Sequence, residues 1–243
     1  MIDSFINYLE YEKRSSAHTV LAYRKDLEQA QEFVQLSFSI EDLSHCTHPD
    51  LRAWIIDLVE QLIGPNIVLW GCHVFCKPAS EGYETPWHQD GHYWPIRPLA
   101  TCTVWVALDP STRANGCLRV IPGSHQGKHL HPHLHEDRTD LTLNQRMADG
   151  AFDEANALDL ELEPGQMSMH DVYMIHGAKA NTSGQRRTGV ALRYMPASSH
   201  LDRSLKPVDG QSGVPVSFAT RPLWLLRGKD VSGRNDFTVG HRR

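Results

Sequence analysis

The feature that most constrains the fold of this 243-residue chain is a change of hydrophobic pattern near residue 62. Before this position, apolar residues recur at the spacing of one helical face. From Asn66 onward, the apolar runs are short, rich in β-branched and aromatic residues, and separated by turns that contain Pro or Gly. Many short strands without intervening helices are typical of jelly rolls and barrels. The sequence therefore predicts a mainly β protein preceded by a small all-α domain.

We place the boundary between the two predicted domains after residue 57, which gives domains 1–57 and 58–243. Thr47 and Asp50 have the spacing of a capping box at the start of the last predicted helix. The apolar stripes of the three predicted helices are Ile2, Phe5, Ile6 and Leu9; Val20, Tyr23, Leu27, Ala30 and Val34; and Leu51, Trp54, Ile55, Leu58 and Leu62.

The predicted strands of the second domain lie in the stretches "NIVLWGCHVFCKP", "ATCTVWVAL", "CLRVIPG", "LELEPGQMSMHD" and "TGVALRYMP". Residues 125–160 interrupt this series of predicted strands, because they are first rich in histidine and then acidic. A long insertion of this kind is often a lid or a binding loop. Its histidines are predicted to be solvated rather than to bind a metal: His125, His129, His131, His133 and His135.

His88 and Asp90, in the run "ETPWHQDGHYWP", predict a metal site. On a strand, residues two apart point to the same face, so the imidazole and the carboxylate would reach into one space. A third ligand has to come from a distant strand, where the chain offers His170 and His176. His176 is favoured because it ends an apolar run just before Gly177, and His170 stays the alternative. Two histidines and one carboxylate form the facial triad typical of non-haem Fe(II) oxygenases. Zinc prefers four-coordinate sites with one open position, so a zinc hydrolase stays possible on ligand count alone.

Arg187 lies eleven residues after His176, where the next strand is predicted to return beside the one that carries His176. A guanidinium holds a carboxylate through two parallel hydrogen bonds. A dicarboxylate that chelates iron through its keto-acid end needs such an anchor at its other end. A zinc hydrolase would leave Arg187 without a role.

Several longer stretches carry a family resemblance: "LWGCHVFCKP", "WHQDGHYWPIRPLATCTVWVAL", "NGCLRVIPGSHQGKHLHPH", "EPGQMSMHDVYMIHGAKANTSGQRRTG" and "RPLWLLRGKDVSGRNDFTVGH". From about residue 55 onward, the chain resembles the phytanoyl-CoA dioxygenase family of Fe(II)/2-oxoglutarate oxygenases. The resemblance implies a double-stranded β-helix, a cupin-like jelly roll. It also implies that His88, Asp90 and His176 bind Fe(II), and that Arg187 binds the distal carboxylate of 2-oxoglutarate.

The same resemblance implies further residues around the co-substrate. Trp105 matches an aromatic residue of the family's 2-oxoglutarate pocket, with packing in the core as the alternative. His73 sits where the family lines that pocket, with a strand histidine bonded to its neighbours as the alternative. Ala178 departs from the serine often found two residues after the distal histidine, which removes one hydrogen bond to 2-oxoglutarate.

The reaction implied by the resemblance hydroxylates an unidentified small organic substrate with O2, while 2-oxoglutarate is converted to succinate and CO2. Related halogenases have a small residue at the position of Asp90, which leaves room for chloride, so hydroxylation is expected here. Lys77 and Arg97 are candidates for steering an anionic substrate. The residues around Asp90 are predicted to border the substrate, with ordinary packing as the alternative: Gln89, His92, Tyr93, Trp94 and Arg97.

Residues 1–57 carry a different resemblance. The stretch "MIDSFINYLEYEKRSSAHTVLAYRKDLEQAQEFVQ" is similar to the SAM-like core-binding domain of Xer-type tyrosine recombinases, which helps to clamp DNA. The two resemblances meet near residues 50–60, which suggests a fusion. The alternative function is a DNA-binding fragment joined to an inactive jelly roll. Residues 1–60 hold 5 Lys and Arg against 11 Asp and Glu, a net charge of −6, so DNA binding is expected to be weak.

The five cysteines are scattered along the chain and form no CxxC pair. This favours a reducing cytoplasm over a disulfide framework. Cys72 and Cys76 are predicted to pack within their strand. No stretch approaches ~18 continuous apolar residues, so no membrane partner is expected. Nothing in the pattern indicates an oligomeric state.

Overall fold

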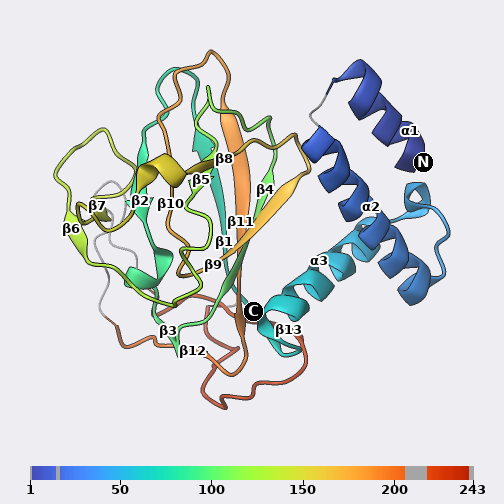
Figure 1. Cartoon of the computed structure of the whole chain (residues 1–243). Coiled ribbons are helices and arrows are strands. Elements are labelled where there is room, and N and C mark those ends of the chain that lie inside the picture. Colours follow the sequence, from blue (N-terminus) through green and yellow to red (C-terminus); the bar gives the residue numbers. More distant parts are fainter. Residues whose placement is uncertain (1, 15–16, 206–217, 241–243) are drawn as a thin grey trace. The chain divides into compact units, whose positions relative to one another are not determined.

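The computed structural model describes residues 2–14, 17–205 and 218–240, and the chain divides into two compact units, Met1–Gln61 and Leu62–Arg243 (Figure 1). The predicted boundary after residue 57 falls inside helix α3 (His48–Ile63), which crosses the division. The helix continues to Ile63 because no breaker precedes Gly64, whose φ of 86° ends the helix just before a proline.

Helices make up the first unit, at the places where the apolar stripes predict them. Ile6, Leu9, Ala30 and Val34 are its most buried stripe residues before α3. At the start of α3, the Asp50 carboxylate accepts hydrogen bonds from the backbone and side chain of Thr47, which is one half of the predicted capping box. The other helical segments are α1 (Ile2–Asn7), a π-helical turn (Tyr8–Glu12), α2 (Ala17–Phe38) and a 3-10 turn (Leu43–His45). None of the helices in the described part of the chain has the length and apolar content of a membrane span.

The second unit is mainly β, as predicted, and all its strand pairs are antiparallel. One sheet has the order β13-β1-β11-β4-β9 and another the order β2-β10-β5-β8; β3 pairs with β12 and β6 with β7. The strands are β1 (Ile67–Lys77), β2 (Thr85–His88), β3 (Ile96–Arg97), β4 (Cys102–Ala107), β5 (Leu118–Val120), β6 (His133–His135), β7 (Gln145–Met147), β8 (Leu158–Leu160), β9 (Met167–Asp171), β10 (His176–Ala178), β11 (Arg187–Pro196), β12 (His200–Leu201) and β13 (Trp224–Arg227).

The insertion at residues 125–160 is not a plain loop, because it contains the β6–β7 hairpin and strand β8, which joins the four-stranded sheet. Its function as a lid stays a prediction. Cys72 and Cys76 lie on β1 but are exposed, so the prediction that they pack inside was wrong. They occupy the outward positions of a strand whose alternate residues, such as Lys77, are buried. All five cysteines are free.

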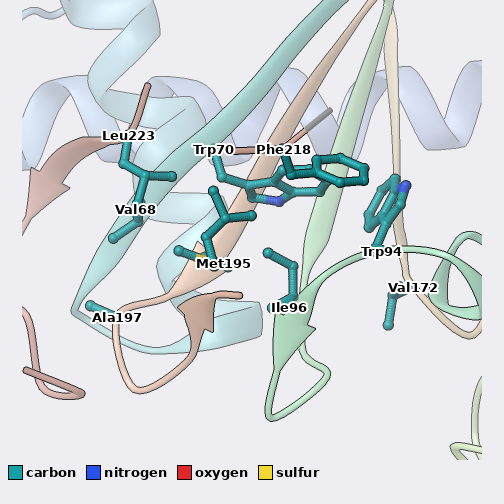
Figure 2. Packing of buried hydrophobic residues seen from close by; sticks show 10 residues of the cluster. Val68, Trp70, Trp94, Ile96, Val172, Met195, Ala197, Phe218 and Leu223 are labelled. Carbon is teal, nitrogen blue, oxygen red and sulfur yellow. The ribbon is translucent and has the colours of Figure 1, made fainter. Parts of the chain in front are cut away.

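A hydrophobic core cluster of the second unit joins β1 and β11 to the segment that follows Asp90 (Figure 2). Trp70 of β1 and Trp94, which follows the predicted metal ligands, pack edge to face with ring centroids 4.7 Å apart. Both are fully buried, beside Ile96, Val172 and Met195. Burial of a large apolar side chain contributes about 1.5–3 kcal/mol. This packing therefore anchors the segment after His88 against β1 and β11.

Candidate metal centre

His88, Asp90 and His176 come together at the junction of β2 and β10. His88 ends β2 and His176 begins β10, and the two residues are direct partners in the antiparallel pair. Asp90 Oδ1 lies 3.7 Å from His88 Nε2, and Asp90 Oδ2 lies 3.9 Å from His176 Nε2. All three side chains are buried, and one ligand atom from each lies within 4.8 Å of the others.

Asp90 reaches this cluster in a way that differs from the prediction. It lies beyond the end of β2 and begins a 3-10 turn (Asp90–His92), so the prediction that both residues lie on a strand was wrong for Asp90. The backbone of Gln89 is still extended, with φ −122° and ψ 126°. The alternation of side chains therefore continues for one more residue, and the carboxylate turns toward His88.

Hydrogen bonds orient the three side chains. His88 Nδ1 lies 2.8 Å from the carbonyl of Pro86, and His176 Nδ1 lies 2.9 Å from the carbonyl of Met174. A carbonyl only accepts hydrogen bonds, so each Nδ1 carries the proton and each Nε2 presents a lone pair. The hydroxyl of Tyr93 donates to Asp90 Oδ1 at 2.8 Å.

Electrostatics favour a cation at this point. Burial and the neighbouring His88 lower the pKa of His176 to about 3, so its ring is neutral at physiological pH. Burial raises the pKa of Asp90, but the proximity of His88 and His176 and the charge of Arg193 outweigh this effect and hold the pKa below its usual range. Two imidazole lone pairs and a carboxylate thus converge without a hydrogen between them. Such acceptors repel each other unless a cation lies among them, and this donor set fits a non-haem iron.

His170, the alternative third ligand, borders the same cluster. It lies on β9, is buried, and its ring centroid is 4.9 Å from that of His176. Burial lowers the pKa of His170 to about 4. Its Nδ1 has no hydrogen-bond partner among the described residues. His170 is not part of the group of convergent ligand atoms that His88, Asp90 and His176 form.

Arg187 lies in the same cavity, which has a volume of about 310 Å³ and is lined from both large sheets. Its strand β11 belongs to one sheet and the strand of His176, β10, to the other, so the prediction that the two strands lie side by side was wrong. Its Nη2 donates to the carbonyl of Gly116 at 2.8 Å, and its Cζ is 5.4 Å from the centre of the Trp105 ring. Burial lowers the pKa of Arg187 to about 10, so it stays charged at neutral pH. Within the described part of the chain, no carboxylate pairs with this buried guanidinium, and its Nε has no partner. A buried, unpaired cation is costly, so the site is suited to an anionic group.

Trp105 and His73 differ in their positions. Trp105 is buried, lines the cavity beside Arg187, and also packs against Ala107 and Ala191. Its contact with 2-oxoglutarate stays a prediction. His73 does not lie on the cavity wall. Its Nδ1 accepts a hydrogen bond of 3.2 Å from Arg193, which does line the cavity.

Lys77 and Arg97 both donate hydrogen bonds to backbone carbonyls, and their role in steering an anionic substrate stays a prediction. The Lys77 ammonium is buried and donates to the carbonyls of Tyr83, Ala178 and Lys179, which uses all its hydrogens. Burial and the charge of Arg187 lower the pKa of Lys77 to about 7. Arg97 donates to the carbonyls of Trp94 and Ile96 and lies outside the cavity wall.

Of the residues predicted to border the substrate, Tyr93 alone lines the cavity. The amide of Gln89 is fully buried and is used by the carbonyls of His129 and Tyr173 and the backbone N–H of His131. Trp94 belongs to the core.

The histidine cluster was predicted to be solvated, and this is wrong for His133. Its Nε2 accepts a hydrogen bond from the backbone of Gln89 at 3.0 Å, and its ring stacks on His92 at 4.3 Å. Burial and His92 lower the pKa of His133 to about 4. His129 and His135 are exposed, as predicted.

Gly189 provides the space that the Trp105 ring occupies. A Cβ built on Gly189 would overlap this ring. We expect Gly189→Ala to displace the indole from Arg187 and to cost about 1–3 kcal/mol of stability, as overpacking does. Thermal unfolding checks this, with Gly184→Ala as the control, because a Cβ there meets no atom within 4 Å. Equal effects of both substitutions would contradict the expected steric role.

Comparisons with known proteins agree with this chemistry. A family model described as phytanoyl-CoA dioxygenase (PhyH) matches residues 5–189, which includes α2 and α3. The chain is 32% identical over 205 residues to the peroxisomal phytanoyl-CoA dioxygenase of Bos taurus, and 31% over 209 residues to that of Homo sapiens. These matches cover 78% of this chain, and 59% and 60% of the two relatives. The chain thus spans about three fifths of their length.

A probable alpha-ketoglutarate-dependent hypophosphite dioxygenase of Stutzerimonas stutzeri is 30% identical over 147 residues, or 60% of this chain and 51% of the relative. Among solved structures, EvdO2 of Micromonospora carbonacea var. aurantiaca complexed with 2-oxoglutarate is 28% identical, with a TM-score of 0.50 over 59% of each chain. The non-heme monooxygenase ThoJ has a TM-score of 0.58 at 24% identity over 86% of this chain and 77% of its own, which shows a shared fold.

Proposed function

Because the chain belongs to the phytanoyl-CoA dioxygenase family, we propose that it is an Fe(II)- and 2-oxoglutarate-dependent dioxygenase that hydroxylates a small organic molecule. The observation that carries this proposal is the convergence of three buried acceptor groups in one cavity with an unpaired buried arginine. We propose that the two large sheets form the double-stranded β-helix around this cavity. A zinc hydrolase would use the same three ligands but would leave Arg187 without a function.

His88, Asp90 and His176 would bind one face of Fe(II) and leave its remaining coordination positions open to 2-oxoglutarate and O2. When bound, iron with 2-oxoglutarate and O2 supplies the oxidising power for hydroxylation, with succinate and CO2 as the co-products. Arg187 would bind the distal carboxylate of 2-oxoglutarate through a charge-assisted pair of hydrogen bonds. Its contact with the Gly116 carbonyl orients the guanidinium, and Trp105 covers one of its sides. Asp90 fills the position that chloride would need, so we expect hydroxylation rather than halogenation.

The direct test of co-substrate binding is anaerobic absorbance after addition of Fe(II). A new visible band should appear with 2-oxoglutarate, whose keto acid chelates the metal. Succinate is the matched control, because it has both carboxylates but no keto group, and it should give no band. The absence of a band with 2-oxoglutarate at saturating concentrations would contradict the proposal.

Tyr93 is proposed to position Asp90 for the metal. We expect Tyr93→Phe to lower the affinity for Fe(II) about 10- to 100-fold, as loss of outer-shell partners of metal ligands does. Anaerobic metal titration measures this. Tyr173→Phe is the matched control, since its hydroxyl donates to the carbonyl of Leu99 instead. Equal losses in both variants would show that the Tyr93 hydroxyl has no specific role at the metal.

The likeness of residues 1–57 to a recombinase domain stays a hypothesis. The family match begins at residue 5 and already includes these helices, so a fusion is not needed to explain them. The net charge of −6 in residues 1–60 also disfavours contacts with DNA phosphates.

A further inference from the structure

A second arginine, Arg193, lines the same cavity at a distance from Arg187. Both residues lie on β11 with two residues of the same face, Gly189 and Ala191, between them. Six residues of a strand span roughly 20 Å. Through Thr103, the sheet register aligns Arg193 with His170, whose ring lies 4.9 Å from that of His176, so this arginine lies on the side of the metal centre.

Arg193 belongs to a row of side chains with unsatisfied polar atoms. In the registers of the large sheet, Arg193 of β11 is the partner of Thr103 of β4, and Thr103 is the partner of His170 of β9. All three residues line the cavity. Arg193 Nε, Thr103 Oγ1 and His170 Nδ1 are all buried without a hydrogen-bond partner in the described part of the chain. Buried polar groups are rarely left unpaired, so a ligand with acceptor atoms is expected here.

The guanidinium of Arg193 lies against aromatic rings and has one side-chain hydrogen-bond partner, His73. It lies 4.7 Å from the centre of the Trp94 ring and 5.8 Å from that of Trp70, two core residues that Figure 2 shows together. Its hydrogen bond to His73 goes to a neutral ring, because burial and the charge of Arg193 lower the pKa of His73 to about 4. None of the described carboxylates forms an ion pair with it.

A third guanidinium, that of Arg221, increases the positive charge at this point. Its Cζ is also 5.8 Å from the Trp70 ring, and its Nε is likewise buried without a partner among the described residues. A Cβ built on Gly71 would lie 3.2 Å from Arg221 Nη1 and 3.5 Å from Arg193 Cδ, so a glycine lies between the two arginines. Like charges in a partly buried site repel each other and attract an anion.

We propose that Arg193 and Thr103, with Arg221 behind them, form a second anion subsite, and that the substrate carries a carboxylate, phosphate or similar oxyanion there. This inference rests on the proposed function, in which Arg187 and the metal hold 2-oxoglutarate. The same chemistry would suit the keto-acid carboxylate of 2-oxoglutarate, so the test has to separate the two sources. Two relatives bear names that refer to anionic compounds, phytanoyl-CoA and hypophosphite.

The test uses the protein loaded with Zn(II) and saturated with 2-oxoglutarate, a complex that does not turn over. Hypophosphite is the probe, and its ³¹P NMR signal reports binding. We expect saturable binding that Arg193→Met weakens about 10- to 100-fold, the range for a hydrogen bond to a charged group. Thr103→Val should weaken it less, and Arg193→Lys should retain part of it. Arg186→Met is the matched control, because Arg186 is exposed and pairs with Asp109 outside the cavity.

Several outcomes would overturn the inference. One is the absence of saturable hypophosphite binding to the wild-type protein. Another is Arg193→Met binding hypophosphite as tightly as the wild type does. A third is Arg193→Met losing as much affinity for 2-oxoglutarate as for hypophosphite. Binding that survives Arg193→Met but disappears without Zn(II) would place the anion on the metal instead. Thermal unfolding of each variant excludes misfolding as the cause. Failure of 2-oxoglutarate to bind the wild-type protein would instead contradict the proposed function.

Discussion

Arg187→Met should weaken 2-oxoglutarate binding by about 2–5 kcal/mol, the cost of truncating one partner of a buried charge pair. The side chain is buried and has no carboxylate partner within the described residues, so its charge is available to the co-substrate. Methionine retains much of the aliphatic stem beside Trp105, which limits the loss of packing. The metal should stay bound, because none of the ligand atoms belongs to Arg187.

The matched control for this variant is Arg186→Met, which removes the same charge from the adjacent residue. Arg186 is exposed and pairs with Asp109, so its loss should leave 2-oxoglutarate affinity unchanged. Titration of the Fe(II)-loaded proteins under anaerobic conditions measures both. If Arg187→Met binds 2-oxoglutarate as tightly as the wild type, the anchor is another arginine, and Arg193 becomes the first candidate.

His176→Ala should abolish iron binding at the concentrations that saturate the wild-type protein. The substitution removes one of three ligands, which costs more than the about 10- to 100-fold typical of outer-shell partners. His170→Ala is the matched control, since it removes a buried histidine whose ring lies 4.9 Å away. Anaerobic titration of Fe(II) with 2-oxoglutarate present distinguishes them. Loss of binding in His170→Ala with retention in His176→Ala would mean that the third ligand is His170.

Local pattern was sufficient to predict the long strands β1, β4 and β11 and the residues that gather at the metal centre, but short strands such as β3, β7 and β12 were not predicted. The apolar runs that predict β1, β4 and β11 correspond to the three central strands of one sheet. These strands were predictable because alternating and β-branched residues are visible in the local sequence. His88 and Asp90 point to the same side although β2 ends at His88, because the backbone of Gln89 between them is still extended.

The failures concern contacts between segments distant in the sequence. Lys77 is saturated by carbonyls that include those of Ala178 and Lys179, about a hundred residues away, and no local pattern predicts such partners. His133 is held by the backbone of Gln89 for the same reason. Arg193 could have been placed on the cavity wall, because the period of two along β11 puts it on the same face as Arg187. Its aromatic surroundings required the three-dimensional structure.

The most direct measurement of the central claim is succinate formation from 2-oxoglutarate by metal-free protein before and after addition of Fe(II). The account predicts O2-dependent succinate formation only after Fe(II) is added, at a slow rate even without the organic substrate. His176→Ala and Arg187→Met should reduce it strongly, whereas Arg186→Met should not. Succinate formed equally without Fe(II), or none formed by the iron-loaded protein that binds 2-oxoglutarate, would contradict the account.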